Sequence, residues 1–132
     1  MAQRYAKNAG VVFSLKYHIV WRPKYRRPVL VKPVDVRLKA LLRLQAEQLE
    51  LTIHEMEVMP DHVHLFVEGG PTICVAEIVN GLKGFTSHEL REQFPFLKSR
   101  LPTLWSRNYY AGSVGSVSET VVRKDIESQK GK

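Results

Sequence analysis

The chain has 132 residues, 44% of them hydrophobic, which is enough for one compact domain (1–132) but not for two. Its formal net charge of +7 favours a polyanionic partner, nucleic acid above all, over an acidic small molecule. The single cysteine, Cys74, excludes an intrachain disulfide and a cysteine-rich zinc site. No segment has the length and composition of a signal peptide or a membrane span, so we expect a cytoplasmic protein without membrane association.

The first third of the chain is predicted to form a strand, a basic loop and a helix. Residues 11–21 alternate between apolar and polar side chains, which is typical of a half-buried strand. Residues 22–28 hold two prolines and four basic residues around Tyr25, and so predict a basic loop. Apolar residues then recur at helical spacing between Val34 and Leu49, which predicts the first helix.

The middle of the chain predicts a β-hairpin, a second helix and a further strand. Residues 52–59 and 62–68 have strand character and are separated by a tight turn. A second amphipathic helix is predicted to start near Thr72, with apolar residues at helical spacing from Val75 to Phe85. Two prolines bracket a stretch, 95–102, that we expect to be irregular, and a fourth strand is expected within 109–114.

The C-terminal segment is predicted to be helical over about 116–130. Ser116 and Glu119 have the spacing of a capping box that opens such a helix. The complete order is β-α-β-β-α-β followed by a helix. This order predicts an α+β, ferredoxin-like (RRM-like, split βαβ) domain, with an antiparallel sheet, two helices on one face and the other face open.

Two histidines in the third predicted strand are candidates for a metal site. His62 and His64 fall on the same strand face as Phe66, and imidazoles two residues apart, about 6 to 7 Å along a strand, can bind one divalent ion. From the residues alone, a pair of surface or hydrogen-bonded histidines is the more common explanation of an H-x-H pattern.

Five segments of the chain, taken together, resemble one known family. They are YHIVWRPKYRRPVL, MEVMPDHVHLFVE, GLKGFTS, LWSRNYY and VRKDIESQK. With the H-hydrophobic-H motif at 62–64, they are similar, in the same order, to the single-tyrosine HUH transposases of bacterial and archaeal insertion sequences (the IS200-like, transposase A family). The resemblance extends over almost the whole chain.

This resemblance implies a metal-dependent DNA transposase that nicks and rejoins single strands at DNA hairpins near the ends of a mobile element. It also implies a homodimer, in which two sheets merge and the last helix of one subunit serves the histidine pair of the other. The implied ligands of Mg²⁺ or Mn²⁺ are His62, His64 and Gln129, and the implied nucleophile is a tyrosine four residues before the glutamine.

The chain departs from the family pattern at the nucleophile, because position 125 holds Asp125. A carboxylate is shorter than a phenol, and the mixed anhydride it would form hydrolyses instead of conserving the bond energy for rejoining. We therefore expect impaired cleavage. Three explanations stay open: a natural inactive copy, an introduced substitution, or another tyrosine, Tyr109 or Tyr110, as the nucleophile. The alternative function is a catalytically inactive protein of the same fold that binds DNA hairpins.

Several basic residues are candidates for DNA contacts, although a single surface charge is more often simply solvated. Lys16 and His18 fall on the polar side of the first strand and are expected beside the histidine pair. Contacts to the DNA backbone are expected from Arg22, Lys24, Arg26, Arg27 and Lys83. Tyr25 or Phe85 are candidates for stacking on an unpaired base. An RNA-recognition domain is a weaker alternative, since no RNP-type aromatic signature is visible.

Overall fold

Four antiparallel strands form the sheet at the centre of the protein, in the order β4-β5-β3-β6. The strands are β3 (Leu15–Pro23), β4 (Thr52–Met59), β5 (His62–Gly69) and β6 (Trp105–Ser113). The structure is a computed structural model and describes residues 6–8, 11–115 and 126–127. β3 and β5 are the two central strands, so residues on them are the best placed to build a site on the sheet.

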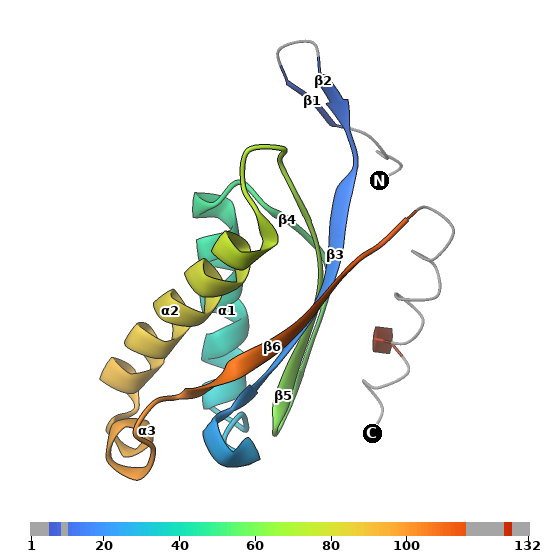
Figure 1. The fold of residues 1–132 in the computed structure, drawn as a ribbon. Coiled ribbons are helices and arrows are strands. Elements are labelled where there is room, and N and C mark those ends of the chain that lie inside the picture. The colour runs from blue at the N-terminus through green and yellow to red at the C-terminus, as the bar shows by residue number, and fades with distance from the viewer. Residues whose placement is uncertain (1–5, 9–10, 116–125, 128–132) are drawn as a thin grey trace.

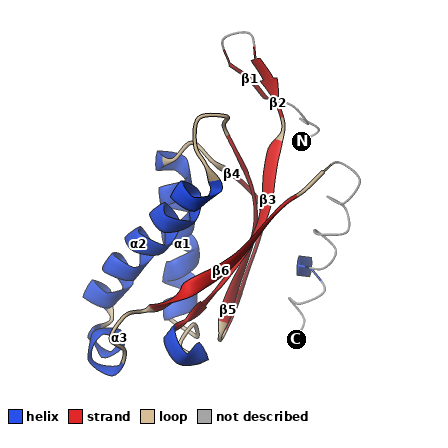
Figure 2. Ribbon diagram, in the orientation of Figure 1, coloured by secondary structure: helices blue, strands red, loops and turns tan. Residues whose placement is uncertain are grey.

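Two long helices cover one face of this sheet, as Figures 1 and 2 show. They are α1 (Val34–Gln48) and α2 (Val75–Gln93), and a short helix, α3 (Pro95–Arg100), follows α2. α2 begins with Glu77 accepting a hydrogen bond from the backbone N–H of Cys74 at 3.0 Å. The order β3-α1-β4-β5-α2-β6 confirms the predicted ferredoxin-like arrangement.

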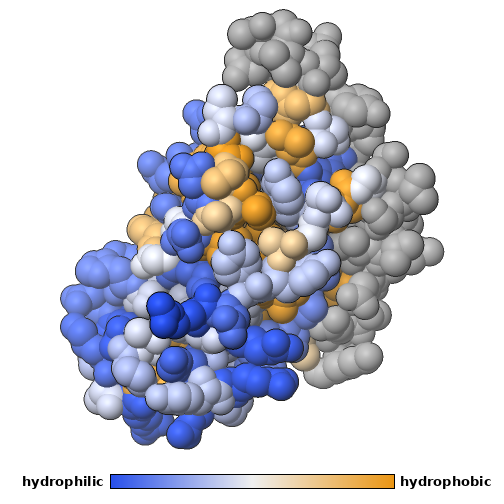
Figure 3. Space-filling view, in the orientation of Figure 1, coloured by the Kyte–Doolittle hydropathy of each residue, from blue (hydrophilic) through white to orange (hydrophobic). Residues whose placement is uncertain are grey.

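The hydrophobic core lies between the sheet and the helices. The strands contribute alternate residues, Ile19 and Trp21 from β3 and Val63, Leu65 and Val67 from β5, and all five are buried. The helices contribute the apolar positions of one stripe, among them Leu38, Leu42, Ile78 and Leu82. The outer surface near α3 is mainly hydrophilic (Figure 3). Burial of the core thus leaves the other residues of β3 and β5 on the opposite face.

The N-terminal strand is shorter than the sequence predicts. The prediction of one continuous strand over 11–21 is wrong, because the chain forms β2 (Val11–Phe13) and then a separate strand, β3, from Leu15. Leu15 pairs with Gly69, the last residue of β5, so β5 offers no partner before this point. β2 pairs instead with β1 (Ala6–Asn8) in a separate two-stranded sheet that the sequence analysis missed.

Two further predictions are corrected near α3 and β6. Residues 95–100 are helical and not irregular, since Pro95 occupies the first helical position, where no N–H is needed. β6 begins at Trp105 and not near Tyr109. The indole N–H of Trp105 donates a hydrogen bond to Thr86 on α2, and the Trp105 ring packs on Trp21. Tyr109 and Tyr110 therefore lie within a strand, paired with Trp21 and Val20.

The predicted C-terminal helix falls largely outside the described residues. Ile126 and Glu127 are helical, and Ile126 is fully buried. Figure 1 draws them on the side of the sheet away from α1 and α2. In the described part of the chain, no helix is long and apolar enough to span a membrane.

Candidate metal and DNA site

The two histidines of the HUH motif lie side by side on the face of the sheet opposite α1 and α2. β5 alternates, so the apolar residues at 63, 65 and 67 enter the core while His62 and His64 point the other way. The ring centroids of His62 and His64 are 4.6 Å apart, with the planes at 67°. The structure therefore brings together the two side chains that the sequence singled out as metal ligands.

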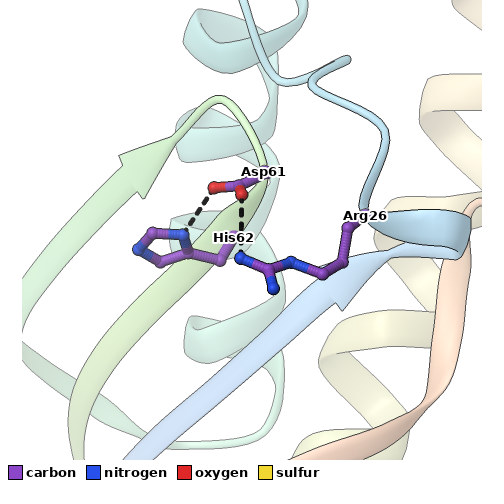
Figure 4. A network of polar contacts seen from close by, with 3 residues as sticks. All are labelled: Arg26, Asp61 and His62. Carbon is purple, nitrogen blue, oxygen red and sulfur yellow. Dashed lines mark hydrogen bonds and ion pairs between the residues drawn. The ribbon is translucent and has the colours of Figure 1, made fainter.

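His62 is held by the residue that precedes it. Its Nδ1 lies 2.7 Å from Oδ1 of Asp61, and Oδ2 of Asp61 accepts a hydrogen bond from Nη2 of Arg26 at 3.4 Å (Figure 4). The hydrogen bond with His62, with a smaller contribution from Arg26, lowers the pKa of Asp61 in spite of its partial burial. Asp61 is thus a carboxylate at neutral pH, suited to accept the Nδ1 proton of His62.

His64 is held by a residue of the neighbouring central strand. Nε2 of His18 on β3 lies 3.4 Å from Nδ1 of His64, and the two rings stack with centroids 5.6 Å apart. His18 was predicted to share the open face, and it does so as a partner of His64. In both HUH histidines the Nδ1 atom faces a protein group, so a metal ion at the pair would be bound through the Nε2 atoms.

The donor set fits Mg²⁺ or Mn²⁺ only in part. Imidazole nitrogen is a suitable ligand for Mn²⁺, and two such donors are in place. Within the residues that the structure describes, no group of three histidine, cysteine or carboxylate side chains is arranged so that it could hold a metal ion. A third protein ligand for the metal ion would have to come from outside the described residues. The predicted ligand Gln129 and the predicted nucleophile position, Asp125, lie outside the described residues.

Lys16, predicted to contact DNA, is buried on the same face of the sheet. Its exposed fraction is 4%, and it pairs across the strands with Glu68. Glu68 in turn accepts a hydrogen bond from His54 on β4 at 2.8 Å. The structure therefore places Lys16 within a buried polar group at the far end of β5 from His62, without exposure to solvent.

The basic loop is a sharp turn at the other end of β3. After Pro23 the chain forms a single 3-10 turn, η1 (Lys24–Arg26), in which Tyr25 and Arg26 have φ of 60° and 52°. These left-handed conformations are unfavourable for residues other than glycine. They leave Tyr25 64% exposed, along with the exposed side chains of Arg22, Arg26 and Arg27, while Lys24 is half-buried. The turn therefore presents an aromatic ring among cationic groups.

A pocket that the sequence analysis missed lies between this turn and β6. Its volume is about 440 Å³. Its walls include Arg22 from the end of β3, Tyr25 and Arg26 from the turn, and Tyr109 and Tyr110 from β6. The ring of Tyr110 lies 6.0 Å from His18, so the pocket adjoins the histidine cluster. The sequence analysis named Tyr109 and Tyr110, but their position beside the turn depends on the pairing of β3 with β6, which the local sequence does not show.

Lys83 and Phe85 do not line this pocket. Lys83 extends from α2, donates a hydrogen bond from Nζ to the backbone oxygen of Ser106 at 2.7 Å, and lies over the ring of Tyr109. Burial lowers the pKa of Lys83. Phe85 is half-buried against the core. Lys83 thus binds β6 to α2, and of the two aromatic candidates for base stacking, Tyr25 is the exposed one.

Comparison with known proteins places this site in a family. The model of the family described as "Transposase IS200 like" matches residues 11–129. The ISDra2 transposase TnpA of Deinococcus radiodurans is 39% identical over 128 residues, covering 96% of this chain and 91% of the relative. The transposase of insertion sequence element IS200 from Salmonella typhimurium is 32% identical, covering 89% of this chain and 81% of the relative.

Solved structures agree with this result. A crystal structure from Deinococcus radiodurans, described as that of a transposase, has a TM-score of 0.78 and 36% identity, covering 94% of this chain and 97% of that one. A REP-associated tyrosine transposase bound to a REP hairpin has the same fold, with a TM-score of 0.63 at 12% identity, covering 96% and 67%. The chain belongs to the IS200-like family of HUH transposases.

Proposed function

We propose that this protein binds single-stranded DNA at hairpins near the ends of an insertion sequence, as a metal-dependent transposase whose strand cleavage is impaired by Asp125. The observation that carries the proposal is the histidine pair, His62 and His64, set beside a turn of cationic and aromatic side chains. Membership of the transposase family supports it.

The histidine pair is suited to hold Mg²⁺ or Mn²⁺, with Gln129 as the proposed third protein ligand. A divalent ion bound there would supply Lewis-acid polarisation of a DNA phosphate. The chain itself orients the imidazoles, through Asp61 at His62 and through His18 at His64. His64 is itself buried, with 9% of its surface exposed, so this side of the pair is also shielded from water.

The turn and the pocket are suited to hold DNA beside the pair. Arg22, Arg26 and Arg27 are exposed, and phosphate contacts from such residues fix the register of a nucleic acid without reading its sequence. Tyr25 offers an exposed ring on which an unpaired base can stack. The structural relative that binds a REP hairpin supports hairpin DNA as the ligand.

Asp125 limits the chemistry that we propose. Family members are expected to attack with tyrosine at this position, and a carboxylate neither reaches as far nor leaves a stable covalent intermediate. The alternative function is therefore a protein that binds DNA hairpins and dimerises but does not cut. These two functions differ in one measurable product, the covalent protein–DNA adduct.

We propose a homodimer in addition. β4 and β6 are the edge strands of the main sheet, and residues 107–110 of β6 are exposed. A bare edge exposes unpaired backbone groups and is commonly covered in native proteins. Pairing with a second copy would cover it. Light scattering of the purified protein should give twice the chain mass of 15.2 kDa.

Hairpin binding can be tested by fluorescence anisotropy with a hairpin oligonucleotide from the ends of the element and a scrambled strand of the same composition. We expect tighter binding of the hairpin, and a log–log salt dependence with a slope of about −0.7 to −0.9 for each phosphate contacted. Equal affinity for the two oligonucleotides would contradict specific recognition. Arg22→Gln should reduce the slope by about one contact, whereas Arg43→Gln, an exposed residue of α1 on the helix side, should leave it unchanged.

A further inference from the structure

A chain of contacts joins the basic turn to the metal-ligand candidate His62. Asp61 uses Oδ1 for Nδ1 of His62 and Oδ2 for Nη2 of Arg26, a residue 35 positions earlier in the sequence. Figure 4 shows the carboxylate of Asp61 between the imidazole and the guanidinium. Arg26 therefore contacts the site from a segment that the sequence assigned only to DNA binding.

The backbone holds these two segments together. The N–H of Leu30, just after the turn, donates to the carbonyl of Pro60 at 3.0 Å, and Pro60 immediately precedes Asp61. On the other side, the N–H of Lys24 donates to the carbonyl of Leu104 at 2.8 Å. The left-handed φ of Arg26 is thus held by hydrogen bonds on both sides of the turn. Unfavourable backbone conformations of this kind persist where the surrounding structure fixes them, and they concentrate at functional sites.

We propose that Asp61 and Arg26 are positioning residues of the metal site, with Asp61 fixing the tautomer and ring orientation of His62 and Arg26 fixing Asp61. This proposal rests on the proposed function in taking His62 as a metal ligand. A carboxylate on Nδ1 keeps the proton there, so Nε2 carries the lone pair that a metal requires. Arg26 orients Asp61 so that the same carboxylate oxygen always faces the imidazole.

The same guanidinium also faces the DNA surface. The side chain of Arg26 is 66% exposed and lines the pocket beside Tyr25, so it has further N–H donors for a DNA phosphate. A phosphate bound at the turn would order the Arg26 side chain, and that ordering would then favour the Asp61 contact as well. DNA and metal should therefore strengthen each other's binding, by equal factors, through this residue.

The position of the proton on His62 is a readout that needs no metal. In ¹⁵N-labelled full-length protein, the side-chain nitrogen shifts of His62 should show a single tautomer with the proton on Nδ1. Asp61→Ala and the isosteric Asp61→Asn should both lose this single tautomer. Asp35→Asn, a control on the first turn of α1, should keep it. A His62 tautomer unchanged in both Asp61 variants would overturn the role of Asp61, whether or not the protein binds metal.

Metal binding then tests the role of Arg26. Calorimetric titration with Mn²⁺ should show about 10- to 100-fold weaker binding in Asp61→Asn and a smaller loss in Arg26→Gln. A hairpin oligonucleotide should tighten Mn²⁺ binding of the unaltered chain and of Arg43→Gln, which removes an exposed cation of α1 on the helix side, but not of Arg26→Gln. If Arg26→Gln behaves like Arg43→Gln, the coupling through Arg26 is wrong. If the unaltered protein binds no Mn²⁺, the proposed metal function fails, while the tautomer result still decides the role of Asp61.

Discussion

Nε2 of His18 lies 3.4 Å from Nδ1 of His64, diagonally across the pairing of β3 with β5. His18 therefore supports the HUH motif from a strand that is distant in sequence. His18→Phe keeps an aromatic ring against His64 but removes the nitrogen. We expect it to weaken Mn²⁺ binding by about 10- to 100-fold, as is typical for loss of a partner of a metal-ligating histidine. Isothermal titration calorimetry measures the effect. His88→Phe, at an exposed position of α2, is the control, and equal affinities for the two variants would contradict this role.

The HUH pair itself should account for specific metal binding. In the His62→Ala, His64→Ala double variant, both imidazole ligands are gone, so Mn²⁺ affinity should fall to the level of nonspecific binding to a protein surface. Titration followed by the electron paramagnetic resonance signal of free Mn²⁺ is a direct measurement. Circular dichroism should show that the sheet persists, because both side chains lie on the face away from the core. Unchanged affinity would remove the metal assignment.

Restoring the phenol at position 125 should restore covalent chemistry if the rest of the site is intact. Loss of a nucleophile commonly lowers a rate by several orders of magnitude, so the unaltered chain should form no adduct with a cognate DNA hairpin. Asp125→Tyr should form one in Mg²⁺ or Mn²⁺, visible as a shifted band on a denaturing gel and abolished by a chelator. An adduct formed by the unaltered chain would point to another nucleophile. Tyr110, with its ring 6.0 Å from His18, would be examined first, through Tyr110→Phe.

The pocket between the turn and β6 predicts a position-specific contact with a base. An oligonucleotide with 2-aminopurine at successive positions should show quenching at the base that stacks on Tyr25. Tyr25→Ala should relieve the quenching and weaken binding by roughly 1–3 kcal/mol, the usual value for one stacked base. Phe96→Ala, at an exposed aromatic position on α3, should change neither quantity. Quenching that persists in Tyr25→Ala would assign the contact to a different ring.

Lys83 predicts a pH dependence of stability in alkaline solution. Burial lowers its pKa below the 10.5 of an ordinary lysine, so between the two values the unfolded chain binds more protons than the folded one. The free energy of unfolding contributed by this group therefore rises with pH across that window and is constant below it. The free energies of unfolding in urea of the unaltered chain and of Lys83→Met should differ by an amount that changes in favour of the unaltered chain as the pH approaches 10.5. A difference independent of pH would contradict the shift.

The parts of the site that were predicted from the sequence are those that depend on how apolar and polar residues repeat along a single strand or helix. Alternation along residues 62–68 separates His62 and His64 from the core residues between them, and the structure has the same separation. The bounds of β4 were also predicted correctly, as was the start of α1. Each of these features depends on neighbours within a few positions of the chain.

The parts that were missed depend on which strands meet and in what register. Asp61 was assigned only to a turn, because its contact with Arg26 joins residues 35 positions apart. Lys16 is buried and lies opposite Glu68 in the register of β3 with β5, and polarity alone predicts neither fact. Likewise, β6 begins early because Trp105 packs on Trp21 and donates to Thr86, and neither contact is visible in the local sequence.

The separation of 46 positions between His18 and His64 has a consequence for how the protein folds. The two imidazoles meet only after the central strands have paired, and pairing over such a separation is slow compared with the formation of local turns and helices. A slip of one residue in the register would turn His18 toward the helices and dismantle the cluster. A divalent ion that binds this cluster would therefore select chains with correctly paired strands, and at 100 times its dissociation constant it would stabilise them by about 2.7 kcal/mol.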